Sequence, residues 1–167
     1  MLRYLDVQNI LDKNDLILQE SGCVGSENER GNTYMKKIGI VTDSHSSISQ
    51  EEAKKLGIFV LPMPFYIDGE CYYESVTLSR ELFFEKLTSG ADISTSQPSP
   101  TAVMEIWDKA LEEYEKILYM PISSGLSSSY NTAMMLAQEE KYEGRVLVVD
   151  DGQVAAPLHQ MILDTLD

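Results

Sequence analysis

The stretch IGIVTDSHSSISQEEAKKLGIFVL, residues 38–61, decides the fold that we predict for this chain. It contains two short apolar runs, residues 38–41 and 58–61, whose β-branched side chains are typical of buried strands. Between them, Ser49 stands three residues before a glutamate, the pattern of a helix start, and Gly57 is the residue type that favours a helix end. The stretch therefore predicts a strand–helix–strand unit.

The alternation of helices and strands continues after residue 100. Pro100 suits a first helical position, and the apolar residues that follow it recur at helical spacing: Val103, Ile106, Trp107, Ala110, Leu111 and Tyr114. Apolar runs at residues 117–122 and 145–149 predict two more strands, each followed by a helix. This order predicts an α/β fold, a Rossmann-like, mainly parallel sheet with helices on both faces and ligand-binding loops at the carboxyl ends of its strands.

A different pattern occupies the middle of the chain. An Asp-Gly pair between strand-like flanks predicts a hairpin over residues 66–73, and Ser79 is the expected cap of a helix over residues 80–87. Pro62 and Pro64 are expected to end the strand before the hairpin, because proline removes a backbone donor. The aromatic pairs in the hairpin and the helix are expected to pack inside these elements.

Residues 1–34 differ from the rest of the sequence. An apolar-periodic stretch is followed by a polar run over residues 20–32, which is typical of a linker. We therefore expect residues 1–34 to be a leader or extension, and residues 35–167 to form the α/β lobe.

The charge of the chain excludes several kinds of partner. Lys and Arg number 13 and Asp and Glu number 27, which gives 13 − 27 = −14. Such a chain repels nucleic acid and anionic membrane surfaces. The sequence shows no signal peptide or membrane-spanning run, and its two cysteines, Cys23 and Cys71, form no disulfide framework, so we expect a cytoplasmic protein without a metal.

Two hydroxyl-rich loops are the candidate functional site. They are STSQPSPT, residues 94–101, and SSGLSSSY, residues 123–130, and each precedes a predicted helix. The first N–H groups of a helix lack partners and carry partial positive charge, so such loops suit a carboxylate or phosphate. Capping explains either loop alone. Serine at five of seven positions from 123 to 129 favours a ligand, held without formal positive charge.

Two other interpretations use the same loops. A serine hydrolase would take its nucleophile from the Ser123–Ser129 loop, which resembles a nucleophile elbow without its last glycine, and would need Asp150 or Asp151 and then His159 downstream. Asp43 with the same two aspartates could instead hold Mg²⁺, although loop capping is the simpler role. His45 is expected to be solvated.

Four motifs, taken together and in order, resemble the DegV family of bacterial fatty-acid-binding proteins. They are IVTDS at 40–44, TSQPSP at 95–100, ISSGLS at 122–127 and VVD at 148–150. The resemblance runs from about residue 37 to the end. It implies the first lobe of a two-lobed α/β protein that buries a long-chain fatty acid between its lobes. Some members present that acid to a fatty-acid kinase, so the resemblance implies a carrier, not an enzyme, without a cofactor.

Carried over by position, the resemblance names the residues that would hold the carboxylate. They are Thr95 and Ser127, with Ser124, Ser123 and Ser94 as neighbours. The family usually has Gly-Thr at positions 128–129, where this chain has two serines. We expect the second lobe to be absent, which leaves either self-association through an uncovered apolar face or an incomplete lobe without ligand.

Overall fold

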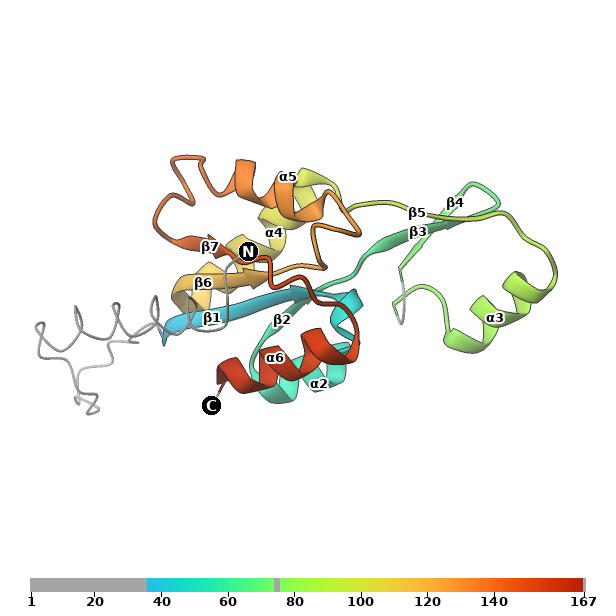
Figure 1. Ribbon diagram of the computed structural model, residues 1–167, viewed down its shortest axis with the longest axis horizontal. Coiled ribbons are helices and arrows are strands. Elements are labelled where there is room, and N and C mark those ends of the chain that lie inside the picture. The colour runs from blue at the N-terminus through green and yellow to red at the C-terminus, as the bar shows by residue number, and fades with distance from the viewer. Residues whose placement is uncertain (1–35, 74–75, 167) are drawn as a thin grey trace, which may run out of the picture.

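The computed structural model describes residues 36–73 and 76–166 (Figure 1). The predicted leader over residues 1–34, with Cys23, lies outside the described residues. The helices and strands follow one another as β1 (Lys36–Asp43), the 3₁₀ turn η1 (Ser44–Ser46), α2 (Gln50–Leu56), β2 (Phe59–Leu61), β3 (Pro64–Ile67), β4 (Glu70–Tyr73), α3 (Arg80–Thr88), β5 (Ile93–Thr95), α4 (Pro100–Glu113), β6 (Tyr114–Met120), α5 (Ser129–Leu136), β7 (Val146–Val148) and α6 (Ala156–Leu166).

The main sheet confirms the predicted α/β fold. Its four strands lie in the order β2-β1-β6-β7, and every neighbouring pair is parallel. Val41 of β1, for example, pairs with Phe59 on one side and with Tyr119 on the other. The sheet is therefore wholly parallel, as the Rossmann-like prediction requires.

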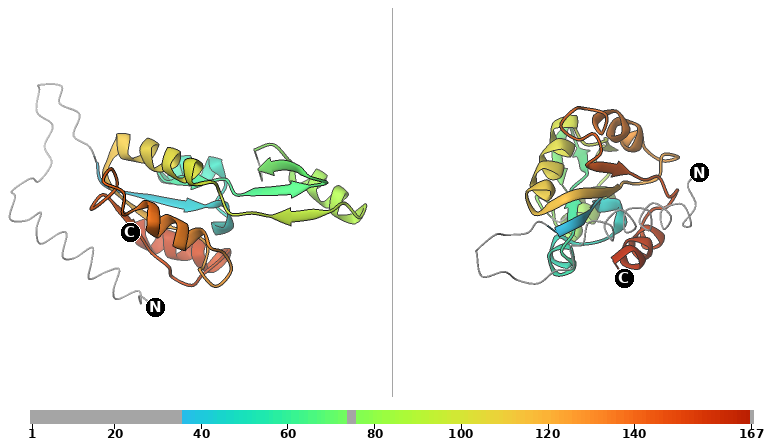
Figure 2. Two further views of the ribbon diagram at one scale, coloured as in Figure 1. Left: turned by 90° about the horizontal axis from the view of Figure 1, so that it is seen from above. Right: turned by 90° about the vertical axis from the view of Figure 1, so that its left-hand side faces the viewer.

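Helices cover both faces of this sheet (Figures 1 and 2). On one face, α4 and α5 bury a core around Val41, Trp107 and Tyr119. On the other face, α2 and α6 bury a second core that includes Ile40 and Leu118. Successive residues of β1 and β6 thus enter opposite cores, because strand side chains alternate between faces.

The helix ends follow the predicted capping. The hydroxyls of Ser49, Ser79 and Ser99 each accept a hydrogen bond from the backbone N–H three residues later, at the starts of α2, α3 and α4. Gly57 ends α2 with a φ of 72°, the left-handed conformation that glycine adopts without strain. The predicted roles of Ser49, Ser79 and Gly57 are confirmed.

A smaller arm projects from the main sheet (Figure 1). It contains α3 and an antiparallel sheet in the order β4-β3-β5. The predicted Asp-Gly turn joins β3 to β4, with φ values of 51° at Asp68 and 85° at Gly69. Pro62 lies after β2 as expected, but the prediction for Pro64 was wrong: it begins β3, a position where strands tolerate proline.

Three further local predictions were wrong. Residues 93–95 form the strand β5 instead of a loop, because they pair with β3. Tyr114 belongs to β6 and pairs with Lys36, so the strand begins earlier than predicted. The predicted aromatic packing in the arm was wrong only for Tyr73 and Phe84, which are exposed, whereas Tyr72 and Phe83 pack against Phe65.

Within residues 36–73 and 76–166, no helix has both the length and the apolar character needed to cross a membrane.

Candidate anion-binding site

The second hydroxyl loop lies where a parallel sheet of this order binds ligands. We call residues 121–128, between β6 and α5, the serine loop. The chain leaves β1 toward β2 on one side and leaves β6 toward β7 on the other, although β1 and β6 are neighbours. Such a reversal opens a crevice outside the carboxyl ends of the two strands, the usual ligand position in α/β sheets. The serine loop starts at this point.

A buried carboxylate fixes the start of the serine loop. Asp43, at the end of β1, has no exposed surface. Its Oδ2 accepts the backbone N–H of Ile122 at 2.8 Å. Its Oδ1 accepts the backbone N–H of His45 at 3.0 Å and lies 3.2 Å from His45 Nδ1. The ends of β1 and β6 are thereby joined through the Asp43 side chain. The expectation that His45 is simply solvated was wrong, because this residue contacts Asp43.

The segment after β7 closes the other side of the serine loop. Ser123 donates its backbone N–H to the carbonyl of Gln153 at 3.1 Å, and Ala155 donates its own to the carbonyl of His45 at 2.7 Å. Asp43, the serine loop and the segment 150–155 therefore form one hydrogen-bonded unit.

Within this unit, the Ser127 hydroxyl lies beside Ser129, the first residue of α5. Its Oγ accepts the backbone N–H of Ser129 at 3.2 Å and shares a 2.8 Å hydrogen bond with Ser129 Oγ. Either hydroxyl can donate that bond, and the Ser127 proton is available when Ser129 is the donor. The side chain is half-buried beside the start of α5, where the helix dipole favours negative charge.

Ser128 shows that this turn does not require glycine. Its φ is −76°, which any residue adopts, and its side chain makes no capping hydrogen bond. The serine pair at 128–129, where the family usually has Gly-Thr, therefore fits the backbone without strain.

Ser123 and Ser124 both make hydrogen bonds within the chain. Ser123 is buried, and its Oγ accepts the backbone N–H of Gly125 at 3.2 Å. Ser124 is exposed, but its backbone N–H donates to Asp150 Oδ1 at 3.2 Å and its hydroxyl donates to Asp150 Oδ2. The hydroxyl of Ser124 thus faces an acceptor of the chain itself.

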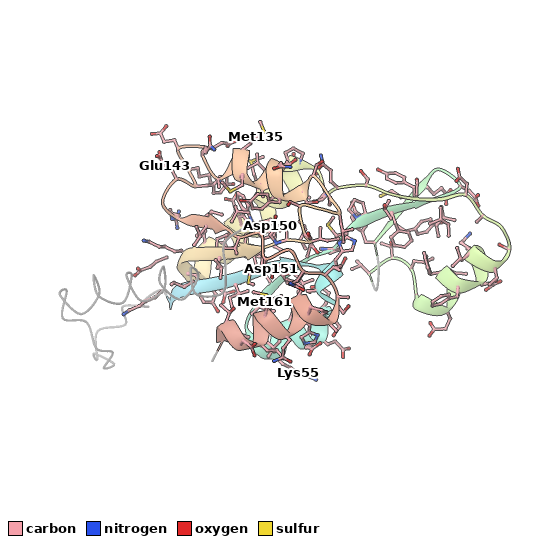
Figure 3. All side chains as sticks on the ribbon, viewed as in Figure 1. Lys55, Met135, Glu143, Asp150, Asp151 and Met161 are labelled. Carbon is pink, nitrogen blue, oxygen red and sulfur yellow. The ribbon has the colours of Figure 1, made fainter. Side chains whose placement is uncertain are left out.

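The pKa values of the two aspartates after β7, Asp150 and Asp151, are shifted in opposite directions; both side chains are labelled in Figure 3. Burial alone would raise the pKa of Asp150, but hydrogen bonds from Ser124 and Gly152 outweigh it and hold this pKa below its usual value. Burial raises the pKa of Asp151 despite a hydrogen bond from the Gln153 N–H, and the charges of Asp150 and Asp43 add to the rise. Asp150 is therefore the carboxylate stabilised in its charged form.

The first hydroxyl loop, residues 94–101, begins in β5 of the arm. Thr95 and Ser94 are exposed residues of β5 that pair with Phe65 and Tyr66. Successive strand residues point to opposite faces, so the two hydroxyls cannot share one cradle. Among the described residues, Thr95 shares no hydrogen bond with Ser127. The first loop instead contacts α5, where the Thr132 hydroxyl donates to the side-chain oxygen of Gln97 at 3.4 Å.

An open hollow of about 310 Å³ lies beside the first loop. One side of the hollow is lined by Pro62 and by Pro64, Tyr66, Cys71 and Tyr73 of the arm, and the other side is lined by the chain from Ser96 to Pro100 and by Ala102. The hollow offers apolar surface next to the residue that follows Thr95.

The residues of the predicted hydrolase triad do not assemble. His159 Nε2 lies 3.3 Å from Glu52 Oε1, so this histidine pairs with α2. Within the described part of the chain, no hydrogen bond joins His159 to the serine loop. In the same residues, no cluster of three or more His, Cys, Asp or Glu side chains could hold a metal ion.

Comparison with known proteins places the chain in a family. A family model described as an uncharacterised protein of the DegV family matches residues 37–166. This chain belongs to the DegV family. A DegV domain-containing protein of Caldanaerobacter subterraneus subsp. tengcongensis is 34% identical over 116 residues, which cover 70% of this chain and 41% of that protein.

Two further DegV proteins show how much of the family this chain represents. A DegV domain-containing 15.5 kDa protein of Staphylococcus aureus is 32% identical over 77% of this chain and 90% of its own length. A solved structure, described as fatty acid binding of a DegV family protein from Thermus thermophilus, matches with a TM-score of 0.70 and 33% identity over 78% of this chain and 46% of that one. The chain thus spans under half of the longer relatives.

Sequence reasoning missed the two carboxylates that hold the DegV serine loop. Asp43 was weighed as a metal ligand or loop cap, and Asp150 was weighed in those roles and as the acid of a hydrolase triad. Their position at the ends of β1 and β7, beside a serine-rich loop that follows the intervening strand, is the signal that could have identified them.

Proposed function

We propose that this chain binds a long-chain fatty acid, with the carboxylate at the serine loop, and acts as a carrier for it. Fatty acid binding is described for the Thermus thermophilus relative, whose structure this chain matches at 33% identity. The geometry of Ser127 carries the proposal for this chain. Its Oγ accepts the backbone N–H of Ser129, and when the Ser129 hydroxyl donates the bond between the two hydroxyls, Ser127 has a proton for an anion at the start of α5.

Hydroxyls and backbone N–H groups suit this ligand in so acidic a chain. With a net charge of −14, long-range attraction cannot recruit an anion. Local donors at a helix start can still hold a carboxylate. We place Thr95 with Ser127 as the second hydroxyl ligand, because its side chain is exposed at the base of the arm.

Burial of the acyl tail supplies the affinity in this proposal. Each buried CH₂ contributes about 0.8 kcal/mol, so a tail of even ten methylenes outweighs a screened surface repulsion. The hollow beside residues 96–100 offers apolar surface for the part of the tail nearest the carboxylate.

The carrier role leaves the chemistry to a partner. We propose that the bound carboxylate is presented to a fatty-acid kinase, and that the chain is not itself an enzyme. The pairing of His159 with Glu52 supports this, because it removes the only histidine downstream of the serine loop from a hydrolase triad.

The test is hexadecanoate binding by the lipid-stripped chain, measured by isothermal titration. Ser127→Ala removes a hydrogen bond to a charged group, worth about 1.5–3 kcal/mol, so we expect roughly 10-fold to 150-fold weaker binding. Ser128→Ala is the matched control, because Ser128 is exposed and its side chain makes no capping bond. Equal affinities of the two variants would refute the site. Measurable ester hydrolysis would favour the hydrolase instead.

We also propose that the lipid-free chain self-associates through apolar side chains. Leu126 of the serine loop and Met135 of α5 are 66% and 74% exposed, and Leu82, Phe84 and Leu87 of the arm are exposed as well. Sedimentation velocity is expected to show association that decreases on lipid binding. A monomer at all concentrations, with no binding of an apolar dye, would contradict this.

A further inference from the structure

A carboxylate of the chain itself already occupies donors of the serine loop. Asp150 accepts the backbone N–H of Ser124 at 3.2 Å and also accepts the Ser124 hydroxyl. The backbone N–H of Gly152 donates to the same Asp150 Oδ1 at 3.1 Å. Both Asp150 oxygens are thus hydrogen-bonded, and this side chain lies in the segment that leaves β7 (Figure 3).

This arrangement decides what Ser124 can offer to a ligand. A serine hydroxyl has one proton, and here that proton is donated to Asp150. The remaining lone pairs of Ser124 can only accept. A carboxylate ligand also only accepts, so it finds no donor in the Ser124 side chain, unlike that of Ser127.

The charge of Asp150 acts in the same direction. Hydrogen bonds from Ser124 and Gly152 hold the pKa of Asp150 below its usual value, so this carboxyl is ionised at neutral pH. A negative charge fixed against the serine loop repels an incoming anion, and the repulsion is strongest where water is excluded.

We propose that Asp150 is a specificity-determining residue that lowers the affinity of the serine loop for anions. It turns the Ser124 proton away from the ligand and places a negative charge beside it. This inference rests on the proposed function. Its consequence is selectivity: an anion with an apolar tail offsets the repulsion by burial, whereas a small anion such as inorganic phosphate does not.

Asp150→Asn tests the proposal with little change of shape. The asparagine oxygen can still accept the N–H groups of Ser124 and Gly152, while its amide nitrogen donates to the Ser124 hydroxyl. The Ser124 proton is then released and the charge is removed. We expect hexadecanoate to bind about tenfold more tightly, which corresponds to about 1.4 kcal/mol, and inorganic phosphate to become a measurable competitor.

Two further variants separate this effect from general charge removal. In the Asp150→Asn background, Ser124→Ala should cancel most of the gain, because the released proton is gone. Asp151→Asn is the matched control: it changes the neighbouring carboxyl, which accepts from Gln153 and not from Ser124, and should alter affinity by less than about twofold.

The outcomes distinguish this inference from the proposed function. Unchanged or weaker binding by folded Asp150→Asn, a gain that persists without Ser124, or an equal gain from Asp151→Asn would overturn the inference while Ser127→Ala still supports the site. If the unaltered chain binds no hexadecanoate, the proposed function fails. Binding by Asp150→Asn alone would then support the inference. Absence of binding in both would overturn it.

Discussion

Removal of the Asp43 carboxylate should break the hydrogen bond that holds the start of the serine loop and should destabilise the whole fold. Asp43→Ala leaves the N–H of Ile122 without its 2.8 Å acceptor, and Ile122 is only 6% exposed. A buried donor that loses a charged acceptor costs about 1.5–3 kcal/mol. Water can reach the half-buried backbone N–H of His45, so the loss of its hydrogen bond to Asp43 adds only about 0.5–1 kcal/mol. The expected total is about 2–4 kcal/mol.

Urea unfolding followed by tryptophan fluorescence measures this cost. Trp107 is the only tryptophan and is fully buried against the sheet, so its emission reports loss of the core. With a denaturant slope of about 2 kcal/mol/M, the midpoint should fall by roughly 1–2 M. Asp92→Ala is the control, because exposed Asp92 contributes its backbone N–H to the arm's hydrogen bond with Asp68. A difference below about 0.5 kcal/mol between the two variants would refute the role assigned to Asp43.

Three other predictions concern the core and the pH dependence. Gly39→Ala places a Cβ 2.7 Å from the Tyr114 ring and should cost about 1–3 kcal/mol in urea unfolding; wild-type stability would contradict that close approach. Tyr119→Phe removes a buried hydroxyl that has no partner among the described residues, so it should leave the free energy of unfolding unchanged or raise it. Tyr142→Phe should cost about 1 kcal/mol, because it breaks a 3.0 Å hydrogen bond to Asp108. A Tyr119→Phe variant less stable than Tyr142→Phe would be inconsistent with both environments. The folded-state pKa of Asp151 is raised, so its stabilising contribution is present below the unfolded pKa and is lost as the pH rises through the folded pKa. Asp151→Asn should therefore raise the urea midpoint at pH 7, and this gain should disappear on acidification. A gain that does not depend on pH would argue against the raised pKa.

Local sequence signals predicted the main sheet and its helices well, because the pattern that indicates each strand or helix lies within a few residues. The apolar runs around Ile40 and Leu118 are buried on both faces, which is why they lack a polar alternation and read as strands of a parallel sheet. Ser49, Ser79 and Ser99 could be identified as caps because a cap acts on residues only three positions away.

Features that depend on distant partners could not be read in this way. The strand β5 has three residues, too few to show a period, and it exists because β3, about 28 residues earlier, offers an edge. The pairing of Ser124 with Asp150 spans 26 positions, and that of His159 with Glu52 joins two helices. For the candidate site, the sequence indicated the residue types, but not the partner of each hydroxyl group within the chain.

Native mass spectrometry of the intact chain purified from a bacterial host shows whether it carries a fatty acid. We expect a bound species with the mass of a long-chain fatty acid in the unaltered protein, and its loss in the Thr95→Ala, Ser127→Ala double variant. A protein that carries no acid, even after incubation with hexadecanoate, would contradict the claim, as would a double variant that retains the acid fully.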